Sequence, residues 1–227
     1  MSVARVCMRD QVRNAILSRI LDGRYPPGTR IKEMSLAREF NVSQAPVREA
    51  LRELEALRLL ESERYRGTRV CSIDLAQLRE AYELRAEIEE ASARRAPPCA
   101  QADLDALEAD IKAMRAALHV QDRESFMRNG IDFHRRIVQM SGNRLFLHAW
   151  EHLAWDVRAR IAASHIGLGL YLEEREAIVA ALREGKGEEA GRQIRALIEH
   201  FLSHLTALER AKETDNIFGK SIPDFRE

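Results

Sequence analysis

The stretch NVSQAPVREALREL at residues 41–54 decides how the first part of the chain is expected to fold. It follows a short apolar segment, SLAREF at residues 35–40, and begins with three turn-forming residues. Ser43 is of the type that caps a helix, and Pro46 stands in the first turn, where a helix tolerates proline. Apolar residues then recur at helical spacing, namely Val47, Leu51 and Leu54. The stretch therefore predicts a turn followed by an amphipathic helix.

The neighbouring segments extend this pattern to a helix-turn-helix with a hairpin. Helices are expected over residues 10–21, 32–40 and 44–59. Residues 60–73 have a hairpin pattern, in which Arg66-Gly67 forms the tip and strand-prone residues follow. In helix-turn-helix proteins, residues near the start of the second helix reach base edges and phosphates. The residues in that place are Gln44, Ala45 and Arg48.

Composition restricts the class of protein. The 227 residues are 45% hydrophobic and 32% charged, which favours a folded chain with a sizeable core over a disordered one. No apolar run approaches the roughly 20 residues of a membrane span, and no signal-peptide core is present, so a cytoplasmic protein is expected. The isolated cysteines Cys7, Cys71 and Cys99 predict neither a disulfide framework nor a zinc motif.

Charge is distributed unevenly along the chain. Residues 1–73 hold 14 Lys/Arg and 9 Asp/Glu, and the remainder holds 22 and 27, although the whole chain is neutral. A net charge of +5 suits a module that contacts phosphates, and a net charge of −5 suits a module that does not. We therefore expect two domains with different partners.

From residue 74 onward the pattern is helical. Amphipathic stretches separated by Pro or Gly signals predict six helices, over residues 74–96, 101–119, 122–140, 143–165, 170–184 and 187–212. The expected fold is therefore mostly α: a winged helix-turn-helix domain at 1–73 and an all-α six-helix bundle at 74–212. Residues 213–227 have no period, which predicts a tail that is mobile or packed on a partner.

The first 73 residues resemble the DNA-binding domain of the gluconate-repressor (GntR) family. The matching segments keep the family's order and spacing: DGRYPPGTRI at 22–31, SLA at 35–37, VSxxPVREAL at 42–51, the leucine-rich segment 57–60, and Arg66-Gly67. An ordinary helical hairpin with a basic surface would not explain the loop, turn, helix and hairpin together.

This resemblance implies a set of DNA contacts. Ser43 would bind phosphate, Arg48 phosphate or guanine, and Arg66-Gly67 the minor groove or backbone, with Lys32 and Ala45 at the same interface. Gln44 would read a base edge. The family usually has arginine at that position, and glutamine favours adenine instead of guanine.

The second part resembles the all-helical effector domain, called FCD, of the fatty-acid-repressor (FadR) branch of the same family. The resemblance covers about residues 74–205 and rests on four segments: ELRAEIE at 83–89, FHRRI at 133–137, SGN at 141–143, and the spacing of Glu174, Ile178, Ala181, Leu182 and Gly185.

Many domains of that branch hold a divalent metal with one Asp and three His ligands. The matching positions are Gly130, His134, Arg175 and Leu197, so a single ligand remains and we predict no metal or other cofactor. Because an arginine in such a cavity pairs with carboxylates or phosphates, Arg175, Arg85 and His134 would bind an anionic effector. The alternative is that Arg175 lies at the surface and pairs with a glutamate.

Two other histidine pairs invite a different interpretation. His148, Glu151 and His152 spell a short metalloprotease-like string, and His200 with His204 could form a relocated metal site. We expect instead that both pairs are partly buried polar groups on helix faces. The aromatic residues near them are expected to build core or dimer contacts, namely Phe146, Trp150, Trp155 and Phe201.

Together these features predict a non-enzymatic bacterial transcription regulator, expected to be a repressor. It would be a cytoplasmic homodimer that binds a palindromic double-stranded DNA operator without contacting a membrane. A small anionic metabolite, expected to be a carboxylate, would change its operator affinity. The alternatives are a zinc-dependent hydrolase using the His148 string and an acyl-CoA-responsive regulator.

Overall fold

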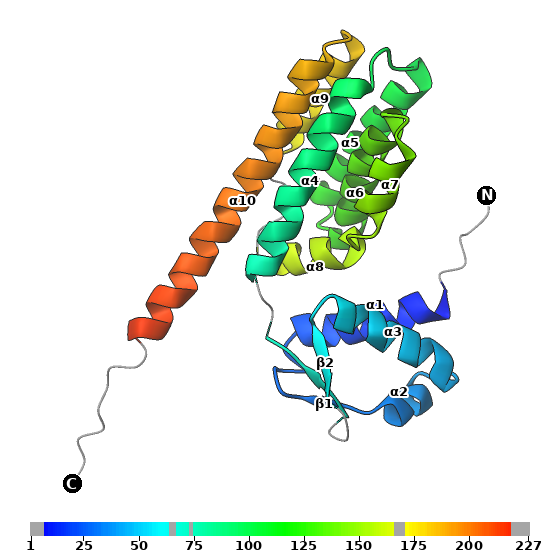
Figure 1. The fold of residues 1–227 in the computed structure, drawn as a ribbon, viewed down its shortest axis with the longest axis vertical. Helices are drawn as coiled ribbons and strands as arrows, with labels where there is room; N and C mark the ends of the chain where they lie inside the picture. The colour runs from blue at the N-terminus through cyan, green and yellow to red at the C-terminus, as the bar shows by residue number, and fades with distance from the viewer. Residues whose placement is uncertain (1–6, 64–66, 73–74, 166–170, 219–227) are drawn as a thin grey trace. The chain divides into compact units, whose positions relative to one another are not determined.

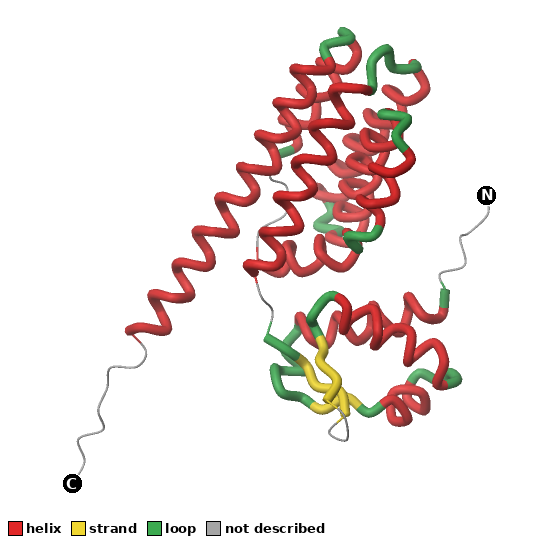
Figure 2. The backbone as a smooth tube through the Cα atoms, viewed as in Figure 1, coloured by secondary structure: helices red, strands yellow, loops and turns green. Residues whose placement is uncertain are grey.

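The chain divides into two compact units, Met1–Asp74 and Leu75–Glu227 (Figure 1). The structure is a computed structural model, and it describes residues 7–63, 67–72, 75–165 and 171–218. Helices dominate both units, and the strands lie in the first unit (Figure 2). The predicted fold class, mostly α with a winged helix-turn-helix followed by an all-α domain, is confirmed.

The first unit is a three-helix cluster with a small sheet. Its elements, in chain order, are α1 Met8–Leu21, β1 Arg30–Ile31, α2 Glu33–Glu39, α3 Gln44–Ala56, β2 Leu60–Glu63 and β3 Gly67–Val70. The apolar stripe of α3 is buried as its spacing predicts, at Val47, Ala50, Leu51 and Leu54. Asn41 takes a left-handed conformation (φ 52°) between α2 and α3, which makes the tight turn of the motif.

The sheet has the strand order β1-β3-β2, and both pairings are antiparallel. The sequence predicts the β2–β3 hairpin but not β1, because two residues carry no periodic signal. Glu63 pairs with Gly67, whose φ of +83° suits a residue without a side chain. Arg66 and Ile73 lie outside the described residues. Of the two residues expected at the hairpin tip, Arg66 and Gly67, the structure therefore describes Gly67 alone.

The second unit contains seven helices among its described residues, one more than the sequence predicts. They are α4 Leu75–Arg95, α5 Gln101–His119, α6 Arg123–Met140, α7 Arg144–Glu151, α8 Trp155–His165, α9 Leu172–Arg183 and α10 Gly187–Phe218. The single helix expected over 143–165 is interrupted at Ala154, which has a φ of 50° that no right-handed helix accepts.

Helix α10 is longer than expected. It continues to Phe218 instead of ending near residue 212. Neither Pro nor Gly occurs between Glu213 and Phe218, so no strong helix breaker ends the helix there. The expected tail at 213–227 is therefore helical in its first part, and residues 219–227 lie outside the description.

Helix α10 packs along α4 (Figure 1). Two glycines permit this approach: a Cβ on Gly187 would lie 2.6 Å from the Arg94 carbonyl oxygen, and one on Gly191 would lie 2.8 Å from the Arg94 Cγ. At Gly187 the two backbones therefore approach too closely for a larger residue, and at Gly191 a larger residue would force the Arg94 side chain to move.

Candidate functional sites

The start of α3 forms an exposed polar surface in the first unit. Ser43 is the N-cap residue, but its side chain makes no capping hydrogen bond. Gln44 and Ala45 are the first two helical residues, and both are exposed. The Ser43 hydroxyl and the unpaired backbone N–H groups of the first helical turn are therefore able to bind phosphate oxygens.

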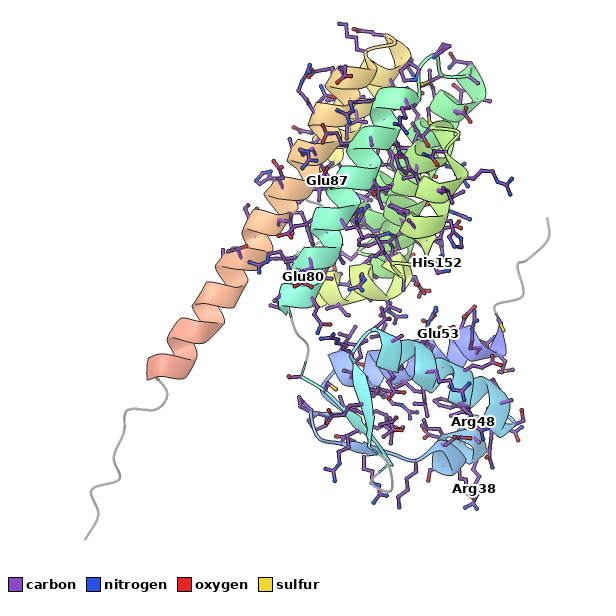
Figure 3. The ribbon with its side chains drawn as sticks, viewed as in Figure 1. Arg38, Arg48, Glu53, Glu80, Glu87 and His152 are labelled. Carbon is purple, nitrogen blue, oxygen red and sulfur yellow. The ribbon has the colours of Figure 1, made fainter. Side chains whose placement is uncertain are left out.

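Arg48 is exposed one turn further along α3, where it pairs with Glu33 of α2. Its Nη2 donates to the Glu33 Oε1 at 2.8 Å, and this pairing raises the pKa of Arg48. Arg38 is exposed on α2, and Figure 3 shows it and Arg48 projecting from the two helices of the motif. Exposed ion pairs contribute roughly 0–1 kcal/mol, so a phosphate can replace Glu33 at little cost.

The sheet supplies further cations that sequence reasoning did not single out. Arg30 of β1 and Arg69 of β3 are exposed and pair directly across the strands, so their side chains share one face. Lys32, at the N-cap of α2, is exposed as well. Arg30 and Arg69 come together because β1 pairs with β3 in this register. The sequence analysis did not predict β1, so it could not place the two arginines side by side.

The second unit contains a cavity of about 120 Å³. Its polar lining comes from α4, α6, α9 and the residue before α9, namely Tyr82, Arg85, His134, Tyr171 and Arg175. The other lining side chains are apolar, and the larger ones among them are Met114, Phe126, Ile131, Leu197, Ile198 and Phe201. One wall is therefore charged and the others are hydrocarbon.

Glu89 organises the charged wall, although sequence reasoning gave it no role. The carboxylate is fully buried, and its Oε1 accepts hydrogen bonds from the Arg85 Nε at 2.6 Å and from the Trp150 Nε1 at 2.7 Å. Its Oε2 lies 2.6 Å from the His134 Nδ1. The i, i+4 spacing of Arg85 and Glu89 in the stripe of α4 that faces the core is the signal that could have revealed this cluster.

The charge states of the cluster follow from burial and proximity. Burial alone would raise the pKa of Glu89, but Arg85 and His134 lower it to about 2. Burial and the Arg85 charge lower the pKa of His134 to about 4, despite the opposing effect of Glu89. At neutral pH, His134 is therefore a neutral imidazole that donates from Nδ1 to Glu89 and presents the Nε2 lone pair.

Arg175 is 92% buried and faces this cluster from α9. Its Nη1 donates to the Tyr171 carbonyl oxygen at 2.7 Å, and its Nη2 lies 3.4 Å from the His134 Nε2. The Nε has no hydrogen-bond partner, and no carboxylate in the described part of the chain forms an ion pair with the guanidinium. Burial and Arg85 lower the pKa of Arg175 to about 10, so it stays charged at neutral pH. The alternative placement of Arg175 at the surface is therefore wrong.

All four positions that match the family's metal ligands line this one cavity, namely Gly130, His134, Arg175 and Leu197. The residues present do not fit a divalent metal, since His134 is the single ligand among them and the Arg175 cation lies beside it. Within the described ranges, no three His, Cys, Asp or Glu side chains come together as a metal site.

The two other histidine pairs are more exposed than expected. His148 and His152 are exposed with ring centroids 4.1 Å apart, and the intervening Glu151 pairs with Arg135 at 2.6 Å. His200 is also exposed, and His204 is half-buried with its Nδ1 2.8 Å from the Tyr171 hydroxyl. The expectation of two partly buried pairs holds for His204 alone.

Of the aromatic residues near these histidines, the two tryptophans pack in the core, whereas Phe146 and Phe201 are half-buried. Trp150 and Trp155 are each 2% exposed, and the Tyr82 ring stacks on Phe201 with centroids 4.4 Å apart. Phe201 also lines the cavity, a role that the sequence analysis did not give it.

The neutral state of His134 predicts acid sensitivity of the fold. Because the pKa is about 4 in the folded chain and near 6.5 when unfolded, the folded state loses stability as the pH falls from 6.5 to 4. The loss should reach up to about 3 kcal/mol, since one pKa unit represents about 1.4 kcal/mol. Urea unfolding of the parent and of His134→Asn, which keeps a donor for Glu89 but cannot titrate, measures this. Equal pH slopes in the two proteins would contradict the assignment.

Comparisons with known proteins agree with both units. The family model described as "Bacterial regulatory proteins, gntR family" matches residues 8–70, and the FCD domain model matches residues 80–200. The chain is 35% identical over 207 residues to a "Probable D-xylose utilization operon transcriptional repressor" of Paenarthrobacter nicotinovorans, covering 90% of this chain and 88% of that one. It is 27% identical over 177 residues to the gluconate operon transcriptional repressor of Bacillus licheniformis, covering 73% and 71%.

A solved structure shows the same fold. It is a GntR transcriptional regulator from Rhodococcus sp. RHA1, with a TM-score of 0.69 at 24% identity over 88% of this chain and 97% of that one.

The matched gntR-family model, the FCD domain and relatives that are transcriptional repressors define a transcription regulator and not an enzyme. The chain belongs to the GntR family of bacterial regulatory proteins and carries an FCD domain. The zinc-hydrolase alternative is therefore wrong. Among the described helices, none is both long and apolar enough to cross a membrane.

Proposed function

We propose that this protein is a repressor that binds a palindromic DNA operator in the cytoplasm and releases it when a small anionic metabolite occupies the cavity of the second unit. The observation that supports operator binding is the exposed start of α3, where Ser43, Gln44 and Arg48 are free of the core. Relatives named as transcriptional repressors support the sign of regulation.

The DNA contacts divide into two kinds. Ser43, Lys32 and the backbone around Gly67 would bind phosphates, which positions the helix without reading sequence. Gln44 and Arg48 would reach base edges in the major groove. Because glutamine suits adenine and arginine suits guanine, we expect an operator half-site that contains both bases.

Arg48→Ala should weaken operator binding by about 1–3 kcal/mol, the usual scale for a specific contact, and leave the fold intact because the side chain is exposed. Glu33→Gln should instead keep or raise the affinity, since it removes a carboxylate that competes with phosphate for Arg48. Gel-shift titrations of the parent and both variants on one operator measure this. Equal affinities for Arg48→Ala and the parent would overturn the contact.

A dimer follows from the two-fold symmetry of a palindromic operator, because each half-site needs one copy of α3. Light scattering should give about twice the chain mass of 26.0 kDa. A monomer at micromolar concentration, both with and without operator DNA, would exclude this assembly.

The effector part of the proposal rests on the cavity. It is enclosed by helices of the FCD domain and contains two buried guanidiniums, of which Arg85 is neutralised by Glu89 and Arg175 is not. A bound anion would pair with Arg175 and bridge α9 to the Glu89 cluster of α4 and α6. It would thereby alter the packing of the helical domain, the kind of differential contact that effector control requires.

A further inference from the structure

The charged wall of the cavity carries one excess positive charge. Arg85 and Arg175 are cations, Glu89 is the one buried anion beside them among the described residues, and His134 is neutral. Burying an uncompensated charge is costly, so a ligand with one negative charge would relieve it and a ligand with two would reverse it. The charge balance therefore favours a monovalent anion.

The free edge of Arg175 fits a carboxylate. Nη1 is engaged by the Tyr171 carbonyl oxygen, whereas Nε has no partner and Nη2 has one long contact with His134. The N–H groups of Nε and Nη2 are parallel and match the two oxygens of a carboxylate. Arg85 is less suited, since its Nε is bound to Glu89 and its guanidinium lies over the Trp155 and Tyr82 rings.

Beyond this edge the lining offers few polar groups to a ligand. Met114, Phe126, Ile131, Ile198 and Phe201 supply hydrocarbon surface. The cavity measures about 120 Å³, and an apolar protein cavity of roughly 150 Å³ is known to hold benzene. The ligand's body should therefore be apolar and about the size of one small ring or a short alkyl chain.

We propose that the effector is a small monocarboxylate with an apolar body, held by the Nε–Nη2 edge of Arg175; this rests on the effector role proposed above. The five hydroxyls of a sugar acid would outnumber the polar groups left to them there, and burying a hydroxyl without a partner is costly. A second carboxylate would lie against hydrocarbon. A coenzyme A thioester exceeds the cavity many times over.

Four six-carbon compounds test this chemistry one group at a time. Hexanoate has the proposed form, hexanamide lacks the charge, gluconate adds five hydroxyls, and adipate adds a second carboxylate. Benzoate and benzamide repeat the charge comparison on a ring. Calorimetry with the full-length protein should show hexanoate or benzoate binding at least ten-fold tighter than its amide, gluconate and adipate, and the same acid should release operator DNA in gel shifts.

Variants locate the binding. Arg175→Met should remove the acid response while keeping operator binding, and it should fold because it replaces an uncompensated buried charge with a side chain of similar length. Arg175→Lys keeps the charge but loses the two parallel N–H groups, so this variant should bind the acid at least several-fold more weakly than the parent. Arg183→Met makes the same change at an exposed position of α9 and should behave as the parent does.

The outcomes separate this inference from the proposed function. If gluconate or adipate binds as tightly as hexanoate and depends on Arg175, the apolar monocarboxylate is wrong but the effector cavity stands. If every acid in the panel fails to bind, or binds equally in Arg175→Met, the effector role of the cavity fails as well. If hexanoate or benzoate binds at least ten-fold more tightly than its amide, gluconate and adipate, and if this binding is lost in Arg175→Met but kept in Arg183→Met, the result supports both the inference and the proposed function.

Discussion

Glu89→Gln is expected to destabilise the second unit by about 3–5 kcal/mol, the usual cost of removing one partner from a buried ionic network. The carboxylate accepts three hydrogen bonds from Arg85, Trp150 and His134. The amide would leave two buried guanidiniums without a counter-charge and would direct an N–H group toward one of three donors. Thermal or urea unfolding of the parent and the variant measures the loss.

A matched control and a second substitution make this test specific. Glu83→Gln makes the same change on α4 at an exposed carboxylate, and it should cost less than about 1 kcal/mol. Arg175→Met added to Glu89→Gln should recover part of the lost stability, because it removes one of the two uncompensated cations. A double variant no more stable than Glu89→Gln alone would mean that charge imbalance is not the cause.

Helix α9 shows how far sequence reasoning could go. Its buried residues Leu172, Ile178, Val179 and Leu182 follow helical spacing, and Arg175 lies in the same stripe. A charge inside an apolar stripe marks a buried polar site, but the pattern alone left Arg175 either at the surface or in the cavity. The partners that stabilise its burial come from α6 and the residue before α9, and a single-helix pattern contains no information about them.

Features that depend on one residue's backbone or on short pairings escaped prediction. The break at Ala154 requires a positive φ, which alanine does not signal as glycine would. Strand β1 exists because β3 provides a hydrogen-bonding edge, so no local pattern marks it. By contrast, α3, α5 and α6 begin and end within three residues of the predicted positions, because their apolar periodicity is strong and turn or cap residues flank them.

The four ligand positions in one cavity predict that a metal site can be restored. Gly130→Asp, Arg175→His and Leu197→His together would place one carboxylate and three imidazoles around the cavity, a donor set for zinc or nickel. His134 already has the orientation of a metal ligand, because the hydrogen bond from its Nδ1 to Glu89 fixes the ring and leaves Nε2 as the ligand atom. Space permits the change at Gly130, where an added Cβ would meet the Met114 Cε at 3.4 Å.

We expect the triple variant to bind a divalent metal with a Kd of about 1 µM or tighter, equivalent to about 8 kcal/mol or more, while the parent binds none at this cavity. The matched control keeps Arg175 and carries only Gly130→Asp and Leu197→His. It should bind at least about 100-fold more weakly, because the guanidinium remains at the metal position and repels a cation. Elemental analysis after dialysis and metal titration by calorimetry measure both variants. A folded triple variant without metal affinity would show that the four positions do not converge on one point. That result would also count against the placement of Arg175 beside an effector carboxylate, because this placement assumes the same convergence.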